Sequence, residues 1–444
     1  MTAATGTASL VGDKRIAIVG GGPAGLMLAR LLQMRGAGVE VFEADAAQDS
    51  RNQGGSLDLH EDSGQLAMRR AGLEDQFRSI SRPEGQASKV FDKYGRLCVD
   101  LRAEDEYQVR PEIDRGALHR LLLEALKPGT VTWGSRLLHA EPDSGRFQLT
   151  FQNGHRAVAD LLFGCDGAWS KVRPLVSPSQ PHYSGVTFIE TRLSSPDADH
   201  PEVARLVGPG NVMAVGDNKA LMAQRNGNGD IRVYVALRVP QAWTRHCGLD
   251  FGRLAEARAG LLKLFSGWSP RLRAMLEEAD DCFVPRPLFT FPPQQIWRSL
   301  PNATLLGDAA HVMPPFTGKG ANYAMLDAAE LADNLTSGCF TDLTAAIRDY
   351  EATMLTRMKL AIGETLASQD LMIALDAPAG LSALVEQRMK RQGGGVRMTA
   401  AQLVRGCARR AWPGFPEMRR LAWIVPNRPR NRPECLASWQ NPAI

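Results

Sequence analysis

The sequence predicts an α/β fold in which a domain of parallel strands is interrupted by an antiparallel β-sheet and followed by C-terminal helices. Near the N-terminus, a glycine-rich turn joins a short apolar run to a helix-forming segment, at "IAIVGGGPAGLMLARLL". Between residues 182 and 291 the pattern changes to short alternating segments such as "IRVYVALRV", which is typical of strands with one buried face. After Leu305 the chain returns to strand, loop and helix. The second half of the chain is therefore expected to complete the first domain.

Composition places the chain among globular proteins and limits the cellular location and the partners to be expected. It has 444 residues, of which 44% are hydrophobic and 23% charged. Seven cysteines are scattered singly without a CxxC pair, which favours reduced thiols over disulfides or a zinc site and predicts no bound metal. A net charge of +4 is too small to indicate nucleic acid. No apolar run approaches the roughly 20 residues of a membrane span, and no signal peptide is evident, so we expect a cytoplasmic protein, monomeric or homodimeric.

The expected elements follow in chain order. A buried strand over residues 14–20, a helix over 23–35 and a strand over 38–43 form a βαβ unit. "DRGALHRLLLEA" predicts a helix capped by Asp114, and "ADLLFG" predicts another strand. Helices are expected over 323–335 and 341–368. The predicted divisions are 13–181 and 292–340 for the two segments of the parallel domain, 182–291 for the inserted sheet, and 341–444 for the long helix and an extension.

The extension is basic, with twelve Lys or Arg and three Glu from Leu381 onward. Its apolar residues recur at helical spacing, which favours a helix packed on the body of the protein. A lid over a substrate channel, a dimer contact and a weak membrane-surface anchor are alternatives.

The first turn carries a dinucleotide-binding pattern. Gly20, Gly22 and Gly25 form G-x-G-x-x-G directly after a strand and at the start of a helix. The first two glycines permit a tight turn and close approach of a pyrophosphate to the helix N-terminus, and the third permits helix and strand to pack. Glu43, at the end of the second strand, is placed to accept hydrogen bonds from a ribose. This context predicts dinucleotide binding.

A second cluster far along the chain indicates which dinucleotide is bound. "GDAAHVMPPFTGKGAN" places Asp308 at a strand end and then a loop rich in Pro and Gly. FAD differs from the nicotinamide cofactors by its ribityl chain and flavin, so an extended FAD needs a second set of contacts. Asp308 is suited to the ribityl hydroxyls, His311 to orienting the loop, and backbone N–H groups of the loop to the flavin. The expected loop contacts are Pro315, Gly318, Gly320 and Asn322.

Three motifs, "VGGGPAGL", "GCDGAWSKVR" and "GDAAHVMPPFTGKGAN", resemble the hallmarks of the single-component (class A) flavoprotein aromatic hydroxylases. Within that class, "GGSLDLHEDSGQLAMRRAGL" and "RPEIDRGALHRLLL" are similar to the tetracycline-inactivating flavin monooxygenases. The resemblance spans about residues 14 to 370. It implies a Rossmann-like FAD-binding domain of the p-hydroxybenzoate hydroxylase type with an inserted substrate-binding sheet.

The resemblance also implies roles for individual residues. Arg51 would approach NADPH, Asp58 and Arg115 would contact FAD, Asp166 would serve both cofactors, and Asp308 would hold the ribityl chain. The implied reaction is hydroxylation of an aromatic or polycyclic small molecule with NADPH and O2, through a flavin C4a-hydroperoxide. The cofactor carries this chemistry, so no catalytic side chain is expected. An FAD-dependent reductase and a flavin-bearing ligand-binding protein remain alternatives.

The expected substrate face departs from the tetracycline enzymes. In an ungapped comparison, Glu190 and Val212 occupy the places of their substrate-binding glutamine and arginine. This exchange removes a cation and adds an acid, which disfavours tetracycline and favours a more lipophilic or differently charged quinolone, polyketide or phenol. Tetracycline inactivation stays an alternative. The predicted substrate-binding residues are Glu190, Val212, Met222, Gln224, Phe289 and Phe291.

Overall fold

The computed structural model describes residues 10–50, 54–101, 110–280 and 282–377. One layer is a five-stranded sheet in which every pair of neighbours is parallel. Its strands, in spatial order, are β17 (Ala303–Leu305), β11 (Leu161–Gly164), β1 (Ile16–Val19), β2 (Val39–Phe42) and β7 (Val131–Thr132). The four residues of β1 and those of β11 are all buried, as their continuous apolar sequence predicts. Since β17 pairs with β11, residues far apart in the chain build one sheet.

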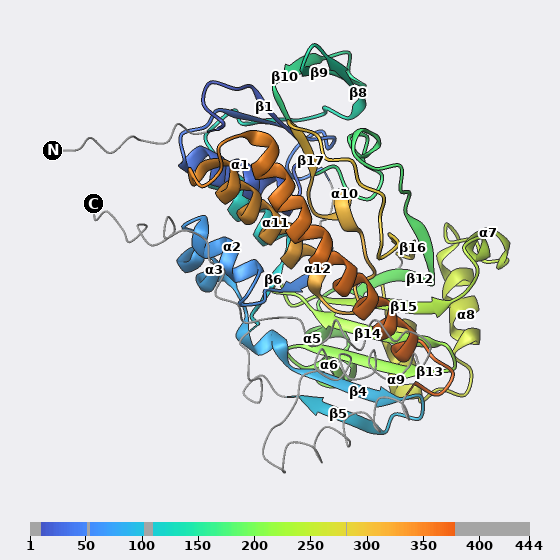
Figure 1. Cartoon of the computed structure of the whole chain (residues 1–444). Helices are drawn as coiled ribbons and strands as arrows, with labels where there is room; N and C mark the ends of the chain where they lie inside the picture. Colours follow the sequence, from blue (N-terminus) through green and yellow to red (C-terminus); the bar gives the residue numbers. More distant parts are fainter. Residues whose placement is uncertain (1–9, 51–53, 102–109, 281, 378–444) are drawn as a thin grey trace, which may run out of the picture.

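Helices cover this sheet in successive layers (Figure 1). α1 (Pro23–Met34) packs on α11 (Lys319–Thr336), and α11 packs on α12 (Leu343–Met372). α1 is apolar nearly all round because it lies between the sheet and α11. Other helices of this half are α2 (Gly64–Arg70), α3 (Glu74–Ile80) and α4 (Arg115–Glu124).

A seven-stranded sheet forms the second half of the molecule. Its spatial order is β16 (Val284–Thr290), β12 (His182–Leu193), β15 (Ile231–Arg238), β14 (Lys219–Arg225), β13 (Asn211–Gly216), β4 (Ser88–Asp92) and β5 (Leu97–Leu101). The strands pair antiparallel except for β13 and β4, which are parallel. The sheet therefore draws two of its strands from residues 88–101 and is not confined to 182–291.

The two faces of this sheet pack against different neighbours. One face forms a core with α6 (Pro201–Val207), α8 (Leu254–Leu264) and α9 (Pro270–Glu277). The other face packs against Phe316 and the end of α12, so it is turned towards the parallel domain. Two short helices, α5 (Pro196–Asp199) and α7 (Trp243–His246), also belong to this half, and α5 packs on α6.

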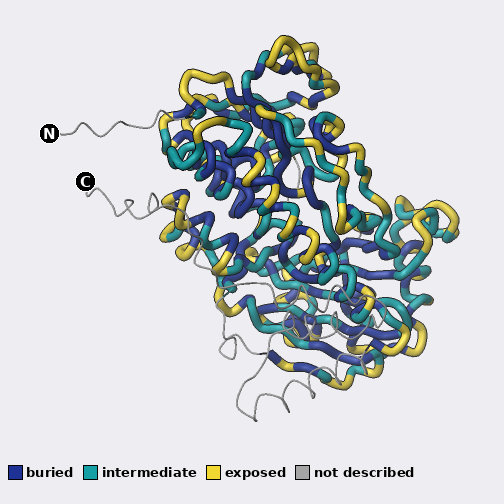
Figure 2. Tube along the Cα trace, viewed as in Figure 1, coloured by how far each residue is buried: buried dark blue, intermediate teal, exposed yellow. Residues whose placement is uncertain are grey.

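Two smaller elements complete the fold. β8 (Leu137–Asp143), β9 (Arg146–Phe151) and β10 (Arg156–Ala159) form an antiparallel sheet whose turns are among the exposed segments in Figure 2. β3 (Ser56–Asp58) pairs with β6 (Glu112–Asp114). Asp114 precedes α4 as expected, but its side chain caps no helix N–H. It accepts hydrogen bonds from Ser56, Arg82 and Gly227 instead, because these donors converge on it.

Two sequence predictions lie outside the described residues: the position of Arg51 and the form of the basic extension after residue 377. Within the described part of the chain, none of the helices combines the length and the apolar character needed to cross a membrane.

Candidate cofactor and substrate site

The carboxyl ends of three parallel strands bring the predicted motifs together. The glycine-rich turn follows β1, Asp166 follows β11 by two residues, and α10 (Asp308–His311) follows β17. Because β1, β11 and β17 are neighbours and run parallel, these three segments meet at one edge of the sheet. Ligands of open α/β sheets bind in the crevice outside the carboxyl ends of the strands.

The three glycines of the first turn have different surroundings. A Cβ on Gly20 would lie 2.2 Å from the carbonyl oxygen of Cys165, and Gly20 has a φ of +105°. A Cβ on Gly25 would lie 2.0 Å from the carbonyl oxygen of Gly20. In contrast, nothing lies within 4 Å of the Cβ position at Gly22, the residue that caps α1. Gly20 and Gly25 thus permit the chain to pack, and Gly22 leaves space in front of the helix N-terminus.

Glu43 fixes this turn from the neighbouring strand end. Its Oε2 accepts a hydrogen bond from the N–H of Gly21 at 2.5 Å, and its Oε1 accepts one from the N–H of Asp45 at 2.8 Å. A ring nitrogen of His119 lies 3.1 Å from the carbonyl oxygen of Gly21 on the other side. The turn is therefore held in shape from β2 and α4, and contact of Glu43 with a ribose stays a prediction.

The segment after β11 holds one carboxylate oxygen ready for a ligand. Oδ2 of Asp166 accepts a hydrogen bond from the N–H of Lys171 at 2.7 Å. Oδ1 is buried and has no hydrogen-bond partner among the described residues, and burial raises the pKa of Asp166.

Arg173, in the same motif, was missed by the sequence reasoning. Its side chain is fully buried, lies 3.6 Å from the ring centroid of Phe291, and donates to the carbonyl oxygen of Ala309 and to Gln295. Burial lowers its pKa to about 10. Arg173 ties the Asp166 segment to α10, and its place in the quoted motif "GCDGAWSKVR" was the available signal.

Asp308 begins α10 and is exposed, whereas the residues behind it form a buried charged network. Nε2 of His311 lies 2.5 Å from Oδ2 of Asp327, and the side chains of both residues are fully buried. Asp327 also accepts hydrogen bonds from the N–H of Gly307 at 3.0 Å and from Arg357 at 2.7 Å. Burial by itself would raise the pKa of Asp327. The charges of His311 and Arg357 outweigh this effect and hold the pKa below its ordinary value. His311 therefore orients α10, as expected, by fixing it to α11 and α12.

Asn322, in the first turn of α11, holds the loop between α10 and α11 in place. Its amide donates to the carbonyl oxygens of Asp58 and Gly318, at 2.7 and 2.9 Å. Its Oδ1 accepts hydrogen bonds from the N–H groups of His60 and Gly64. Since Asn322 is fully buried, we assign it to positioning the loop rather than to direct cofactor contact.

The other predicted loop residues are more open. Pro315 is exposed, and nothing lies within 4 Å of the Cβ position at Gly320. Gly318 has a φ of +66°, and a Cβ there would lie 2.6 Å from Oδ1 of Asp58. Arg115 is exposed at the start of α4. Asp58 is itself held by His60, at 2.9 Å.

These surroundings fit an extended FAD. The space in front of Gly22 and the N-terminus of α1 suit a pyrophosphate. The unpartnered buried Oδ1 of Asp166 and the exposed carboxylate of Asp308 suit hydroxyl groups further along the cofactor. The open side of Gly320 permits a flat ring to approach the loop backbone.

The face of the large sheet that is turned towards this crevice carries several predicted substrate residues. Glu190 of β12, Met222 of β14 and Tyr234 of β15 are cross-strand neighbours on that face. Gln224 accepts a hydrogen bond from the N–H of Ser56 and donates one to Glu112, so it links the large sheet to the two-stranded β3–β6 sheet. Phe289 stacks edge-on against Trp169, with ring centroids 5.0 Å apart.

Two predicted substrate residues need correction. Val212 is buried in the core beneath α6 and α9, because strand alternation directs its side chain to the opposite face of the sheet. Phe291 is fully buried in the main core, where its ring packs against Arg173. Neither side chain faces the crevice.

Sequence reasoning also missed two arginines on the crevice face, Arg232 and Arg286. Both form ion pairs with Glu190. Arg232 and Tyr234 alternate with buried apolar residues in "IRVYVALRV". This alternation was the signal that places Arg232 and Tyr234 on the face opposite those apolar residues.

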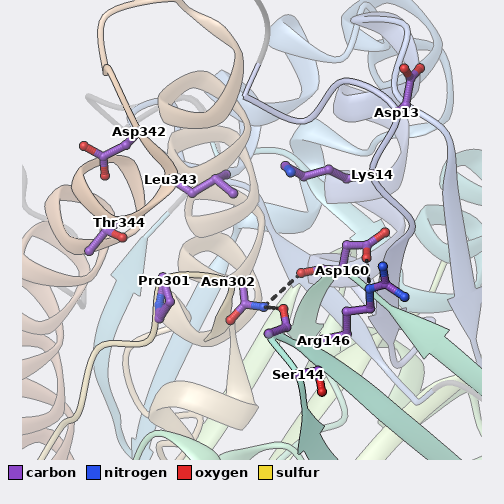
Figure 3. Close-up of a pocket in the computed structure, with 11 residues that line it drawn as sticks. Asp13, Lys14, Ser144, Arg146, Asp160, Pro301, Asn302, Asp342, Leu343 and Thr344 are labelled. Carbon is purple, nitrogen blue, oxygen red and sulfur yellow. Dashed lines mark hydrogen bonds and ion pairs between the residues drawn. The ribbon is translucent and has the colours of Figure 1, made fainter.

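A large cleft lies at the opposite edge of the parallel sheet (Figure 3). Its volume is about 670 Å³. Its lining residues include Lys14, Asp160 and Asn302, which precede β1, β11 and β17. It therefore opens at the amino ends of the strands, away from the glycine turn, Asp166 and Asp308.

Comparison with known proteins agrees with this geometry. Residues 13–238 and 302–352 match the family described as "FAD binding domain". The chain is 30% identical over 419 residues to "Monooxygenase asqM" of Emericella nidulans, an alignment that covers 79% of this chain and 93% of the relative.

Two solved structures share the fold. HpxO of Klebsiella pneumoniae "complexed with FAD and uric acid" matches with a TM-score of 0.72 and 22% identity, covering 90% of this chain and 97% of that chain. Tetracycline destructase Tet(51) matches with a TM-score of 0.62 and 16% identity, covering 87% and 99%.

Proposed function

The chain belongs to the FAD-binding-domain family and is an FAD-dependent monooxygenase of the aromatic hydroxylase type, and on that premise we propose that it uses NADPH and O2 to hydroxylate an aromatic or polycyclic small molecule. The observation that carries the proposal is the meeting of Gly22, Asp166 and α10 at one sheet edge, together with a second sheet whose face carrying Glu190 and Tyr234 is turned towards the parallel domain. Such a crevice holds a long cofactor on one side and a small molecule on the other.

FAD, when bound, supplies the redox chemistry and the activation of O2. We assign the holding of FAD to Gly20, Gly22, Gly25, Glu43, Asp58, Arg115, Asp166, Asp308, Pro315, Gly318 and Gly320. Asn322 positions the segment to which the last three belong. The contribution of the protein is then binding, orientation and exclusion of water, because water in the crevice favours release of hydrogen peroxide over transfer to the substrate.

NADPH is proposed as a transient partner without a domain of its own. The chain has one dinucleotide fingerprint, and we assign that fingerprint to FAD. From the family resemblance, we propose Arg51 and Asp166 as its contacts.

Substrates of the similar proteins are chemically varied. HpxO is solved in complex with uric acid, and Tet(51) is a tetracycline destructase. For this chain we propose an aromatic or polycyclic small molecule. Tetracycline itself, reduction without oxygen transfer, and ligand binding alone are the competing functions.

Mass spectrometry of reactions in labelled oxygen tests the proposal. The purified yellow protein is supplied with NADPH and ¹⁸O₂, together with tetracycline and a panel of quinolones, phenols and polyketides. A compound that accelerates NADPH oxidation and gains one labelled oxygen atom supports the proposed reaction. Turnover that persists without oxygen indicates a reductase, and a ligand-induced flavin spectrum without any turnover indicates a binding protein.

A further inference from the structure

The helix that begins with Asp308, α10, is a single turn whose shape depends on contacts from other segments. Hydrogen bonds from the N–H groups of Ala310 and His311 to the carbonyl oxygen of Gly307 define the turn. One turn of helix is not stable by itself, because too few hydrogen bonds form for the number of residues that are fixed. The position of Asp308 therefore depends on the side chains that hold this turn in place.

The carbonyl groups near the end of α10 are held by two side chains from outside the helix. Ala309 and Ala310 are fully buried. The last carbonyl groups of a helix have no N–H partner within it, and a buried carbonyl without a partner costs free energy. Arg173 donates to the carbonyl oxygen of Ala309, and Nε2 of Gln295 donates to that of Ala310 at 3.0 Å. Both carbonyl groups are thus satisfied.

Gln295 also holds the arginine beside it. Its Oε1 accepts a hydrogen bond from Nη1 of Arg173 at 3.1 Å. Glutamine suits this place because its amide donates and accepts at once, whereas an ionised glutamate only accepts and methionine has no N–H or O–H to donate. Gln295 therefore links the segment that carries Asp166 to the helix that carries Asp308.

Gln295 lies outside the three sequence motifs, on the connection between the two sheets. β16 ends at Thr290 and β17 begins at Ala303, so residues 291–302 lead from the large sheet to the parallel sheet. The N–H of Phe291 donates to the carbonyl oxygen of Val312, the residue after α10, at 3.1 Å. The connection is therefore bonded both to α10 and to the chain that follows it.

We propose that Gln295 is a positioning residue of the FAD site, which sets where the carboxylate of Asp308 meets the cofactor. It acts through α10, since its amide is engaged at both atoms by Arg173 and Ala310. A binding site has to hold its groups within about 0.5 Å of the productive geometry, and a single helical turn needs outside support to do so. This inference rests on the proposed function, because that function assigns Asp308 to FAD.

Titration of the apoprotein with FAD tests the proposal. Gln295→Met keeps the length of the side chain and removes both hydrogen bonds, so we expect FAD to bind about fivefold more weakly. Gln295→Glu keeps the acceptor for Arg173 but places an anion against the carbonyl oxygen of Ala310, and should weaken FAD binding at least as much. Gln294→Met changes the neighbouring glutamine, which is exposed, and its FAD affinity should match that of the parent protein.

A double-mutant cycle shows whether Gln295 acts through Asp308. In the Asp308→Ala background, Gln295→Met should change FAD affinity by less than about twofold, because the carboxylate that it positions is gone. Independent sites would give the same loss in both backgrounds. Urea unfolding of each apoprotein is measured alongside, since a general loss of stability would weaken FAD binding equally with and without the Asp308 carboxylate.

Two outcomes would overturn the proposal. One is parental FAD affinity in both Gln295 variants, and the other is an equal loss in the two backgrounds. If Gln295→Met does not fold, Gln295→Glu takes its place in the cycle. Failure of the proposed assignment of Asp308 gives a different result, because Asp308→Ala would then bind FAD as the parent does. A weakened Asp308→Ala beside unaffected Gln295 variants would refute this inference alone.

Discussion

At the scale of single residues, the glycines of the first turn divide into two that permit packing and one that faces open space. Gly22→Val places a branched side chain where we assign the pyrophosphate, so we expect the variant to fold and to lose FAD. Flavin content after purification measures this. Gly38→Val is the matched control, since Gly38 also has nothing within 4 Å of its Cβ position but lies before β2, away from the crevice. Normal flavin content in Gly22→Val would contradict the assignment.

Asp308 provides a second test at this scale. We expect Asp308→Ala to weaken FAD binding about tenfold or more, because a charged acceptor would be lost from the ribityl hydroxyls. Titration of the apoprotein with FAD gives the dissociation constant. Asp13→Ala removes an exposed acid from the cleft at the other edge of the same sheet, and its FAD affinity should match that of the parent protein. Equal affinities in all three proteins would remove Asp308 from the site.

At the scale of elements, the two-stranded β3–β6 sheet meets the large sheet through a buried carboxyl group. Glu112 accepts hydrogen bonds from Asn211 at 3.2 Å and from Gln224 at 3.1 Å. Burial, with the nearby charge of Asp58, raises the pKa of Glu112 to about 8. The contact between the two-stranded sheet and the large sheet is therefore expected to depend on pH.

The sign of this dependence follows from the raised pKa. A carboxyl that holds its proton more tightly when folded gives stability that is fully present below its unfolded pKa and is lost as pH rises through the folded value. We expect the free energy of unfolding to fall by up to about 1.4 kcal/mol per pH unit between roughly pH 5 and 8 from this group. Urea titrations across this range measure the slope.

Substitution isolates the contribution of Glu112. Glu112→Gln should flatten the dependence and be more stable than the parent above pH 8, because the buried group can no longer ionise. Glu84→Gln, an exposed change on the adjacent 3-10 turn, should keep the parental slope. An unchanged slope in Glu112→Gln would refute the assignment.

At the scale of the whole molecule, α12 connects the two sheets (Figure 1). Near its start, the hydroxyl of Tyr350 donates to the carbonyl oxygen of Leu305, in the strand before α10. Near its end, Gln369 donates to the carbonyl oxygen of Ser184, and Arg238 donates to that of Ile373. The helix therefore helps to set how the large sheet sits relative to the parallel domain.

Loosening the far end of α12 should reduce the share of NADPH oxidation that leads to hydroxylated substrate, and should affect FAD binding less. We expect the double variant Arg238→Ala and Gln369→Ala to retain FAD but release more hydrogen peroxide per NADPH oxidised, since a looser crevice admits water. Peroxide assays in the presence of an accepted substrate measure this. Thr356→Ala, exposed in the middle of the same helix, is the control. Unchanged peroxide release in the double variant would show that these contacts do not control the access of water to the crevice.

The sequence predicted some features well for physical reasons. β1, α1 and β2 were expected at nearly their observed bounds, because continuous apolar strands and a glycine turn are local signals. The substrate face was less predictable. An ungapped comparison selected Val212, yet strand alternation buries that residue beneath the helices, and the cations come from β15 and β16.

By itself, the sequence determined the βαβ unit, the three cofactor motifs and the family, because each depends on residues close together in the chain. Tertiary structure decided how His311 is anchored and which charges gather around Glu190. These features depend on contacts between residues far apart in the chain. Only the packing of the two sheets and α12 brings such residues within hydrogen-bonding distance.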